Sequence, residues 1–231
     1  MAEQIPIQFD LKVEQSFASF YTAKHEEVVR HLTRTANGTG EQQIFLWGDK
    51  GLGKTHLLQA CCQHAQYLNR SVFYLELKAG KLPPSSVLDG IEDSDIVCID
   101  NIEYCAGNCE WELALFNFYN LSRANNHQLV ISAHGPANEI PLQLADLKTR
   151  MSWGLSLKLH ELSDSEQIAA FTCKAKYLGF EISPQVGQFL NKHYASDLRA
   201  LWGLLPKLEQ STLIAKRKLT LPFLKQILSE E

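Results

Sequence analysis

The chain has 231 residues and 45% of them are hydrophobic, so it can bury the core of one large domain or of two smaller ones. Its 22 basic and 26 acidic residues give a formal net charge of -4, which excludes the overall positive field that many nucleic-acid-binding proteins carry. No apolar run approaches the ~20 residues of a membrane span, and the N-terminus lacks the pattern of a signal peptide, so we expect a cytoplasmic protein.

Short apolar runs alternate with helix-like segments between residues 43 and 159. The first run, 43–47, is followed by a glycine-rich turn and by a segment with helical periodicity over 55–67. Strands that alternate with helices in this way are typical of a mostly parallel sheet with both faces covered. We expect the other strands at 72–77, 95–100, 128–132 and 155–159, and further helices at 111–124 and 142–150.

The pattern changes after residue 159, where strand-like runs end and helix-start signals follow one another. Ser163 and Glu166 have the spacing of a capping box for a helix that extends to about residue 177. Three further helix starts are expected at Ser183 before Pro184, at Ser196 with Asp197, and at Thr220 with Pro222. The sequence therefore predicts an α/β domain over 13–160, a small all-helical domain over 161–231, and a flexible N-terminal peptide over 1–12.

Residues 48–55, GDKGLGKT, match the phosphate-binding pattern GxxxxGK[ST] and lie between a predicted strand and a predicted helix. In such a loop the backbone N–H groups turn toward phosphate oxygens, and the helix N-terminus adds a positive dipole. Lys54 would reach the β- and γ-phosphates, and the Thr55 hydroxyl would bind Mg²⁺. The alternative is a glycine turn that matches the pattern by chance. The nucleotide-binding residues that we expect here are Gly48, Lys50, Gly51, Leu52, Gly53, Lys54, Thr55 and His56.

A second strand, 96–100, ends in Asp100, which we expect to hold the same metal ion as Thr55 when nucleotide is bound. In an active hydrolase a further acid orients the attacking water, but the next residue here is Asn101. An amide can hydrogen-bond a water and cannot take its proton at neutral pH. We therefore expect nucleotide binding with weak or no turnover by the chain itself. The alternative is that Glu103 or a more distant acid replaces the missing group.

Four motifs together resemble the AAA+ domain of the bacterial replication initiator DnaA. They are the phosphate loop, IDNIE at 99–103, LKTR at 147–150 with WGL at 153–155, and SDLRAL at 196–201. The resemblance extends over nearly all of the chain, and within this DnaA-related AAA+ family it is strongest for regulatory inactivators of the initiator. It implies an AAA+ P-loop nucleotide-binding domain with a parallel sheet, followed by a small all-helical lid domain.

The resemblance also implies roles for single residues. Arg150 matches the arginine finger, which acts in trans on the nucleotide of a neighbouring subunit; read alone, it could cap the C-terminus of its helix. Arg199 matches the sensor-2 arginine, which contacts the phosphates of the chain's own nucleotide. Phe20 and Tyr21 lie in the segment that closes over the base, although aromatic residues at this spacing are also common in cores. His134 stands where the family usually has an acid or an amide near the γ-phosphate.

The N-terminal segment 4–9, QIPIQF, is similar to the hexapeptide with which many bacterial proteins bind the β sliding clamp of DNA polymerase III. In such a peptide Gln4, Ile5, Ile7 and Phe9 would contact a groove on the clamp. The alternative is an apolar tail that packs on its own domain. The chain ends at residue 231 without a helix-turn-helix domain, so we expect contact with DNA only indirectly, through the clamp.

The resemblance implies a negative regulator of replication initiation that binds DnaA and stimulates hydrolysis of DnaA-bound ATP, leaving inactive ADP-DnaA. We expect bound ADP rather than ATP, Mg²⁺ only together with nucleotide, no membrane contact, and weak head-to-tail self-association. Two alternatives stay open. An autonomous AAA+ ATPase could act on DNA or load a helicase, and a metabolic kinase could use the same loop, although no acceptor-substrate motif is evident.

Overall fold

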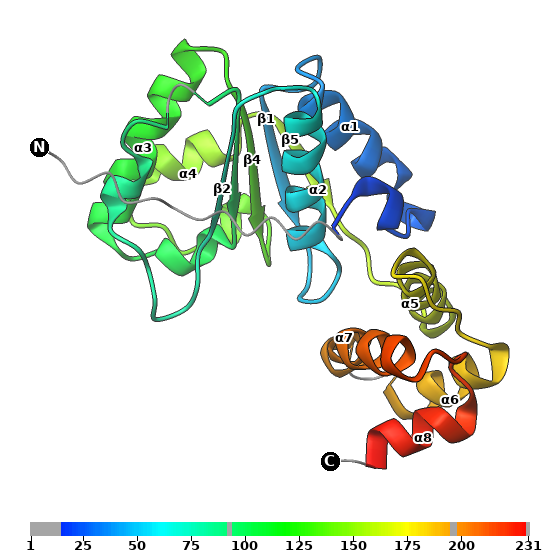
Figure 1. Ribbon diagram of the computed structural model, residues 1–231. Helices are drawn as coiled ribbons and strands as arrows, with labels where there is room; N and C mark the ends of the chain where they lie inside the picture. The colour runs from blue at the N-terminus through cyan, green and yellow to red at the C-terminus, as the bar shows by residue number, and fades with distance from the viewer. Residues whose placement is uncertain (1–14, 92–93, 195–197, 230–231) are drawn as a thin grey trace, which may run out of the picture.

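The computed structural model describes residues 15–91, 94–194 and 198–229 (Figure 1). The segment 4–9 that resembles a clamp-binding peptide lies outside these residues. The described chain forms a sheet with helices on both faces, followed by four helices without further strands.

The sheet has five strands in the order β2-β3-β4-β1-β5, and every neighbouring pair is parallel. The two strands with all residues buried, β3 and β4, lie beside one another in it, as expected for a sheet covered on both faces. The predicted parallel sheet is confirmed, and each strand begins and ends within one residue of its prediction. The strands are β1 (Gln43–Trp47), β2 (Val72–Glu76), β3 (Ile96–Asp100), β4 (Gln128–Ala133) and β5 (Leu155–Lys158).

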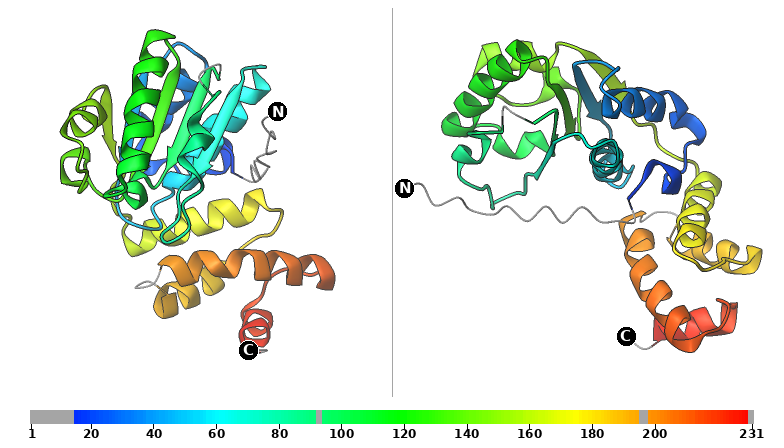
Figure 2. Two further views of the ribbon diagram at one scale, coloured as in Figure 1. Left: turned by 90° about the vertical axis from the view of Figure 1, so that its left-hand side faces the viewer. Right: turned by 45° about the horizontal axis from the view of Figure 1, so that its top comes forward.

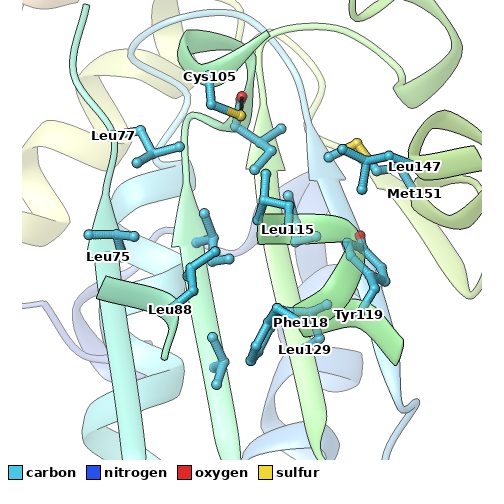
Figure 3. Close-up of a cluster of buried hydrophobic side chains, with 14 of the residues drawn as sticks. Leu75, Leu77, Leu88, Cys105, Leu115, Phe118, Tyr119, Leu129, Leu147 and Met151 are labelled. Atoms are coloured by element: carbon cyan, nitrogen blue, oxygen red, sulfur yellow. Dashed lines mark hydrogen bonds between the residues drawn. The ribbon is translucent and has the colours of Figure 1, made fainter. Parts of the chain in front are cut away.

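Helices α3 (Cys109–Ala124) and α4 (Ala145–Met151) cover one face of the sheet, and α1 (Glu26–Ala36) and α2 (Lys54–Tyr67) cover the other (Figure 1). Successive strand residues point to opposite faces. In β1, Phe45 therefore joins the core under α3, while its neighbours Ile44 and Leu46 join the core under α1 and α2. Figure 3 shows the first of these cores, in which leucines of the strands and Leu115 and Phe118 of α3 pack together.

The C-terminal helices form the lid, which has a hydrophobic core of its own. Figure 2 shows these helices as a separate group joined to the sheet by the segment between β5 and α5. The predicted capping box is confirmed, because the Ser163 backbone N–H donates to Glu166 Oε2 at 2.7 Å. Hydrogen bonds from Lys24 and Ser163 hold the pKa of Glu166 at about 2. The lid helices are α5 (Asp164–Tyr177), α6 (Pro184–Tyr194), α7 (Leu198–Ala215) and α8 (Leu221–Ser229).

Helix α1 was not expected from the sequence. Its buried residues are Val28, Leu32, Thr35 and Ala36, and most of the other positions are polar. The N-cap position, His25, makes no side-chain capping bond, so a recognisable helix start is also missing. Packing on α2 therefore provides the stability that neither composition nor capping predicts.

Helix α4 begins at Ala145, three residues later than the predicted 142–150. A buried carboxylate on α3 explains the difference. The backbone N–H groups of Gln143 and Leu144 donate to Glu112, at 2.9 and 2.7 Å, and the Gly107 N–H donates to the same carboxylate at 2.7 Å. Glu112 satisfies these donors, Leu144 has an extended backbone, and α4 therefore starts at Ala145.

Replacing Glu112 by alanine should lower the free energy of unfolding by about 2 to 4 kcal/mol, because it leaves several buried N–H groups without acceptors. Glu112→Gln keeps one acceptor oxygen and should cost roughly half as much. Urea unfolding followed by circular dichroism measures both. The exposed Glu27→Gln variant is the matched control and should change stability by less than ~0.5 kcal/mol. A cost below ~1 kcal/mol for Glu112→Ala would show that the carboxylate does not hold the start of α4.

Candidate functional site

A cleft of about 1060 Å³ lies between the carboxyl ends of the strands and the lid. Because all five strands are parallel, the segments that follow β1, β3 and β4 meet at this edge. The α/β domain contributes the phosphate loop and the segment around Phe20, and the lid contributes residues of α5 and α7. The residues that line the cleft include Phe20, Tyr21, His25, residues 50–56, Asn101, His134, Lys174 and Trp202.

Two glycines of the phosphate loop cannot be replaced by a larger residue, because their φ angles are positive and an added Cβ would meet neighbouring atoms. Gly48 and Gly53 have φ values of +151° and +95°, in the range that L side chains rarely adopt. A Cβ on Gly48 would lie 2.7 Å from the Leu159 carbonyl oxygen, and one on Gly53 would lie 2.7 Å from the Phe20 ring. The backbone of the loop therefore requires glycine at both positions.

The Lys54 side chain is buried at the start of α2 and points into the phosphate loop. Its ammonium donates to the carbonyl oxygens of Gly48, at 2.6 Å, and Asp49, at 2.8 Å. Burial lowers the pKa of Lys54, and the nearby Asp100 opposes this shift. The ammonium thus stabilises the loop from within.

Asp100 is fully buried at the end of β3 and accepts three hydroxyl hydrogen bonds. Thr55 Oγ1 donates at 2.6 Å, Tyr74 OH donates at 3.2 Å, and Ser132 Oγ donates to the second carboxylate oxygen. Burial raises the pKa of Asp100, and the hydroxyl hydrogen bonds oppose the shift. The Asp100 carboxylate and the Thr55 hydroxyl beside it are an oxygen donor set of the kind that suits Mg²⁺.

The residues beside Asp100 differ from those of an active hydrolase in a specific way. Asn101 has a left-handed backbone, with φ of 60°, and its N–H donates to Ser132 Oγ at 3.0 Å. The nearby acid, Glu103, lies with Oε1 in close contact with Nδ1 of His134. Burial lowers the pKa of His134, and Glu103 opposes this shift. The carboxylate that could activate a water is thus engaged by His134, the residue at the predicted sensor-1 position.

Phe20 and Tyr21 line the cleft beside the phosphate loop. The Phe20 ring packs between two imidazoles, with centroids 5.4 Å from His56 and 6.1 Å from His25. His56 Nε2 lies 2.9 Å from the Ser16 carbonyl oxygen, and burial lowers the pKa of His56 to about 4. The structure therefore brings the aromatic segment together with the phosphate loop, and His56 holds the two in contact.

Three residues that line the cleft, His25, Lys174 and Trp202, were not predicted from the sequence. The His160 N–H donates to His25 Nε2 at 3.0 Å, so His25 connects the end of β5 to the N-terminal segment. Lys174 of α5 donates to Ser19 Oγ at 3.3 Å, and Trp202 of α7 lines the cleft from the lid. Lys174 falls on the same face of α5 as Ala170 and Phe171, and a lysine at such a position is a signal that the sequence contains. Arg199 lies in α7, and its side chain is outside the described part of the chain.

Arg150 lies at the opposite edge of the sheet from the cleft. Gln43, the first residue of β1, donates from its side chain to the Arg150 carbonyl oxygen at 3.0 Å. The phosphate loop begins after the last residue of β1, which is about 13 Å farther along the strand at ~3.3 Å per residue. The Arg150 guanidinium carbon stacks 4.0 Å from the centroid of the Phe116 ring and 5.5 Å from that of Trp153. The structure therefore separates Arg150 from the other predicted nucleotide-binding residues.

Two sequence families match different parts of the chain. The family described as the bacterial DnaA ATPase domain matches residues 11–82, and the family described as the Hda lid domain matches residues 164–228. Domain III of DnaA from Thermotoga maritima has a similar structure, with a TM-score of 0.71 and 22% identity over 94% of this chain and 97% of that one. The chain is a DnaA-related AAA+ protein. The predicted AAA+ α/β fold with a helical lid is confirmed.

Other AAA+ structures are similar to this DnaA-related protein at lower identity. AMPPCP-bound DnaA from Aquifex aeolicus has a TM-score of 0.62 and 18% identity over 80% of this chain and 61% of that one, so this protein spans about three-fifths of that chain. The RuvB branch migration motor of Thermotoga maritima has a TM-score of 0.61 and 16% identity over 88% of this chain and 68% of that one. Both likenesses are evidence for the fold. Within the described residues, no helix combines the length and apolar character that a membrane crossing requires.

Replacing Asp100 by asparagine should stabilise this DnaA-related protein without nucleotide while weakening Mg²⁺-dependent nucleotide binding. A carboxyl whose folded-state pKa is raised contributes stability at low pH and loses it as pH rises through that pKa. The stability gained by Asp100→Asn should therefore be about 1 kcal/mol or more near pH 8 and should shrink toward pH 5. Thermal unfolding and nucleotide titration with and without Mg²⁺ measure the two effects.

Asp95→Asn is the control of opposite sign, because hydrogen bonds from Ser71 lower the pKa of the exposed Asp95. Such a carboxylate contributes stability above its unfolded pKa, so its removal should destabilise the protein near pH 8. Asp100→Asn could instead destabilise the nucleotide-free protein equally at pH 8 and pH 5. The buried carboxylate would then act as a stabilising hydrogen-bond acceptor and not as a ligand for a cation.

Proposed function

We propose that this DnaA-related protein binds a nucleotide in the cleft and hydrolyses it weakly or not at all. The phosphate loop would hold the phosphates through its N–H groups and Lys54, and Thr55 and Asp100 would bind Mg²⁺ together with the nucleotide. Phe20 and Tyr21 would contact the base. The contact between Glu103 and His134 supports low turnover, because it occupies the acid that could orient a water. We expect ADP, and not ATP, to be the nucleotide that is bound to the resting protein.

We further propose that the protein inhibits replication initiation by stimulating hydrolysis of ATP bound to DnaA. The observation that carries this proposal is the position of Arg150, at the edge of the sheet opposite to its own phosphate loop. An arginine there is available to the nucleotide of an adjacent subunit. A guanidinium is always charged, and its fork of N–H donors matches phosphoryl oxygens. Fingers supplied in trans can raise the rate of phosphoryl transfer by about 10³ to 10⁵.

In this mechanism the two edges of the sheet have different tasks. The chain's own nucleotide occupies the cleft between the α/β domain and the lid and sets the relative position of the two. The opposite edge docks on ATP-bound DnaA and places Arg150 beside the γ-phosphate. Charge that develops on the phosphoryl oxygens in the transition state is then neutralised by the guanidinium. The contact is head to tail, so the same surfaces would also support weak self-association.

We propose that residues 4–9 bind the β sliding clamp and bring the regulator to DNA that is being replicated. The support is the sequence QIPIQF, with Gln4 to fix the register and Ile5, Ile7 and Phe9 to fill apolar pockets in a groove. Pro6 reduces the conformational freedom that an extended peptide loses when it binds. DNA contact through a clamp also agrees with the net negative charge of the chain.

Replacing Arg150 by alanine should abolish the stimulation of DnaA-bound ATP hydrolysis, by about 10³-fold or more, and leave nucleotide binding by the variant unchanged. Arg150→Lys should recover little activity, because an ammonium lacks the bidentate fork. Phosphate release is measured with DnaA and clamp-loaded DNA, and with each component omitted. Normal stimulation by Arg150→Ala would exclude the finger role, and strong release by the wild-type protein alone would favour an autonomous ATPase.

The double variant Gln4→Ala with Phe9→Ala should lose binding to the isolated clamp while keeping the wild-type melting temperature and nucleotide affinity. Surface plasmon resonance with immobilised clamp measures the loss, which we expect to exceed tenfold because both ends of the peptide are changed. A variant with Gln8→Ala, which changes a residue between the proposed anchors, is the control. Clamp affinity that is equal for the double variant and the wild type would leave residues 4–9 as an apolar tail.

A further inference from the structure

Two arginines, Arg123 and Arg150, lie over the ring of Trp153. The guanidinium carbon of Arg123, at the end of α3, lies 4.5 Å from the centroid of the Trp153 ring, and that of Arg150 lies 5.5 Å from the same centroid. The two carbons are therefore at most 10 Å apart, the sum of those distances. Trp153 is 41% exposed, so the cluster is accessible at the surface.

These three side chains line one cavity of about 580 Å³ at the amino-terminal edge of the sheet. Gln43 also lines the cavity, and Gln42 donates to the Arg123 carbonyl oxygen at 3.2 Å. The cavity thus lies between the start of β1, the end of α3 and the end of α4. It is distinct from the nucleotide cleft, which lies at the other edge.

Neither guanidinium is neutralised within the described part of the chain. Glu41 contributes to the lining of the cavity, but no carboxylate of the described residues lies within ion-pair distance of Arg123 or Arg150. Two like charges at this separation repel one another, since the Debye length is ~10 Å at 0.1 M salt. An anion between them would remove the repulsion and gain charge-assisted hydrogen bonds from both.

We propose that Arg123, stacked on Trp153, binds the phosphates of the nucleotide in the partner subunit together with Arg150. The proposal rests on the proposed finger role of Arg150 and adds a second cation to it. A bound triphosphate carries several negative charges along its length, so two guanidinium groups can contact different phosphoryl groups. Stacking on Trp153 holds the long Arg123 side chain near the cavity before binding, which reduces the freedom that binding removes.

The test is single-turnover hydrolysis of ATP bound to DnaA, measured over a range of concentrations of this protein with clamp-loaded DNA present. Arg123→Ala should lower the maximal rate by about tenfold and Arg123→Lys by less, because lysine keeps the charge without the fork. Arg217→Ala is the matched control, since Arg217 also stacks on an aromatic ring, that of Phe223 in the lid, at 3.7 Å. It should leave the maximal rate unchanged. Arg123 is exposed, so the melting temperature should not change.

The dependence of the hydrolysis rate on the concentration of this protein distinguishes a contact with the reacting phosphates from a docking contact. A lower maximal rate at saturation supports a contact that forms with the reacting phosphates. A change only in the half-saturating concentration would overturn the proposal, because Arg123 would then be a docking contact. No effect of Arg123→Ala while Arg150→Ala is inactive would overturn it and leave the finger role intact. If Arg150→Ala were fully active, the finger role and the present proposal would both be wrong.

Discussion

The parallel direction of all five strands is the constraint on which the rest of the structure depends. It collects the carboxyl ends of the strands at one edge, where the phosphate loop, Asp100 and His134 meet beneath the lid. It also collects the amino ends at the other edge, where Gln43 holds the end of α4 and the Arg150 guanidinium stacks on aromatic rings. A protein built in this way presents a nucleotide cleft on one side and a cationic surface on the other, which is the arrangement that a head-to-tail contact between AAA+ subunits needs.

Charge placement at the two edges follows opposite physical rules. In the cleft, Asp100 is buried among hydroxyl donors and Lys54 among carbonyl oxygens of the loop. Each charged group is thus held in a fixed position, in which a ligand of opposite charge can bind it. At the far edge the arginines lie on aromatic surfaces and remain partly exposed. The buried charges suit a tightly held nucleotide, and the partly exposed arginines suit a contact that forms and dissociates. The pairing of Glu103 with His134 fits a chain whose own nucleotide has a structural task.

The sequence predicts the parts of this structure that local patterns encode. Continuous apolar runs mark the strands, and the parallel order then brings Thr55 and Asp100 together without further information. Features that depend on tertiary contacts could not be predicted. The start of α4 is set by the Glu112 carboxylate from another helix, and the contact between Glu103 and His134 depends on the path of two loops. The resemblance to DnaA supplied a role for Arg150, but Phe116, on which its guanidinium stacks, carries no sequence pattern that links it to Arg150.

The most direct test of the account follows radioactive γ-phosphate from two separate sources. DnaA loaded with labelled ATP is mixed with this protein carrying unlabelled nucleotide and with clamp-loaded DNA, and the experiment is repeated with the label on this protein and unlabelled DnaA. We expect that label is released from DnaA only after mixing and that label on this protein is retained. Release from this protein, or release from DnaA at an unchanged rate after mixing, would contradict the claim that the chain acts on the nucleotide of a partner.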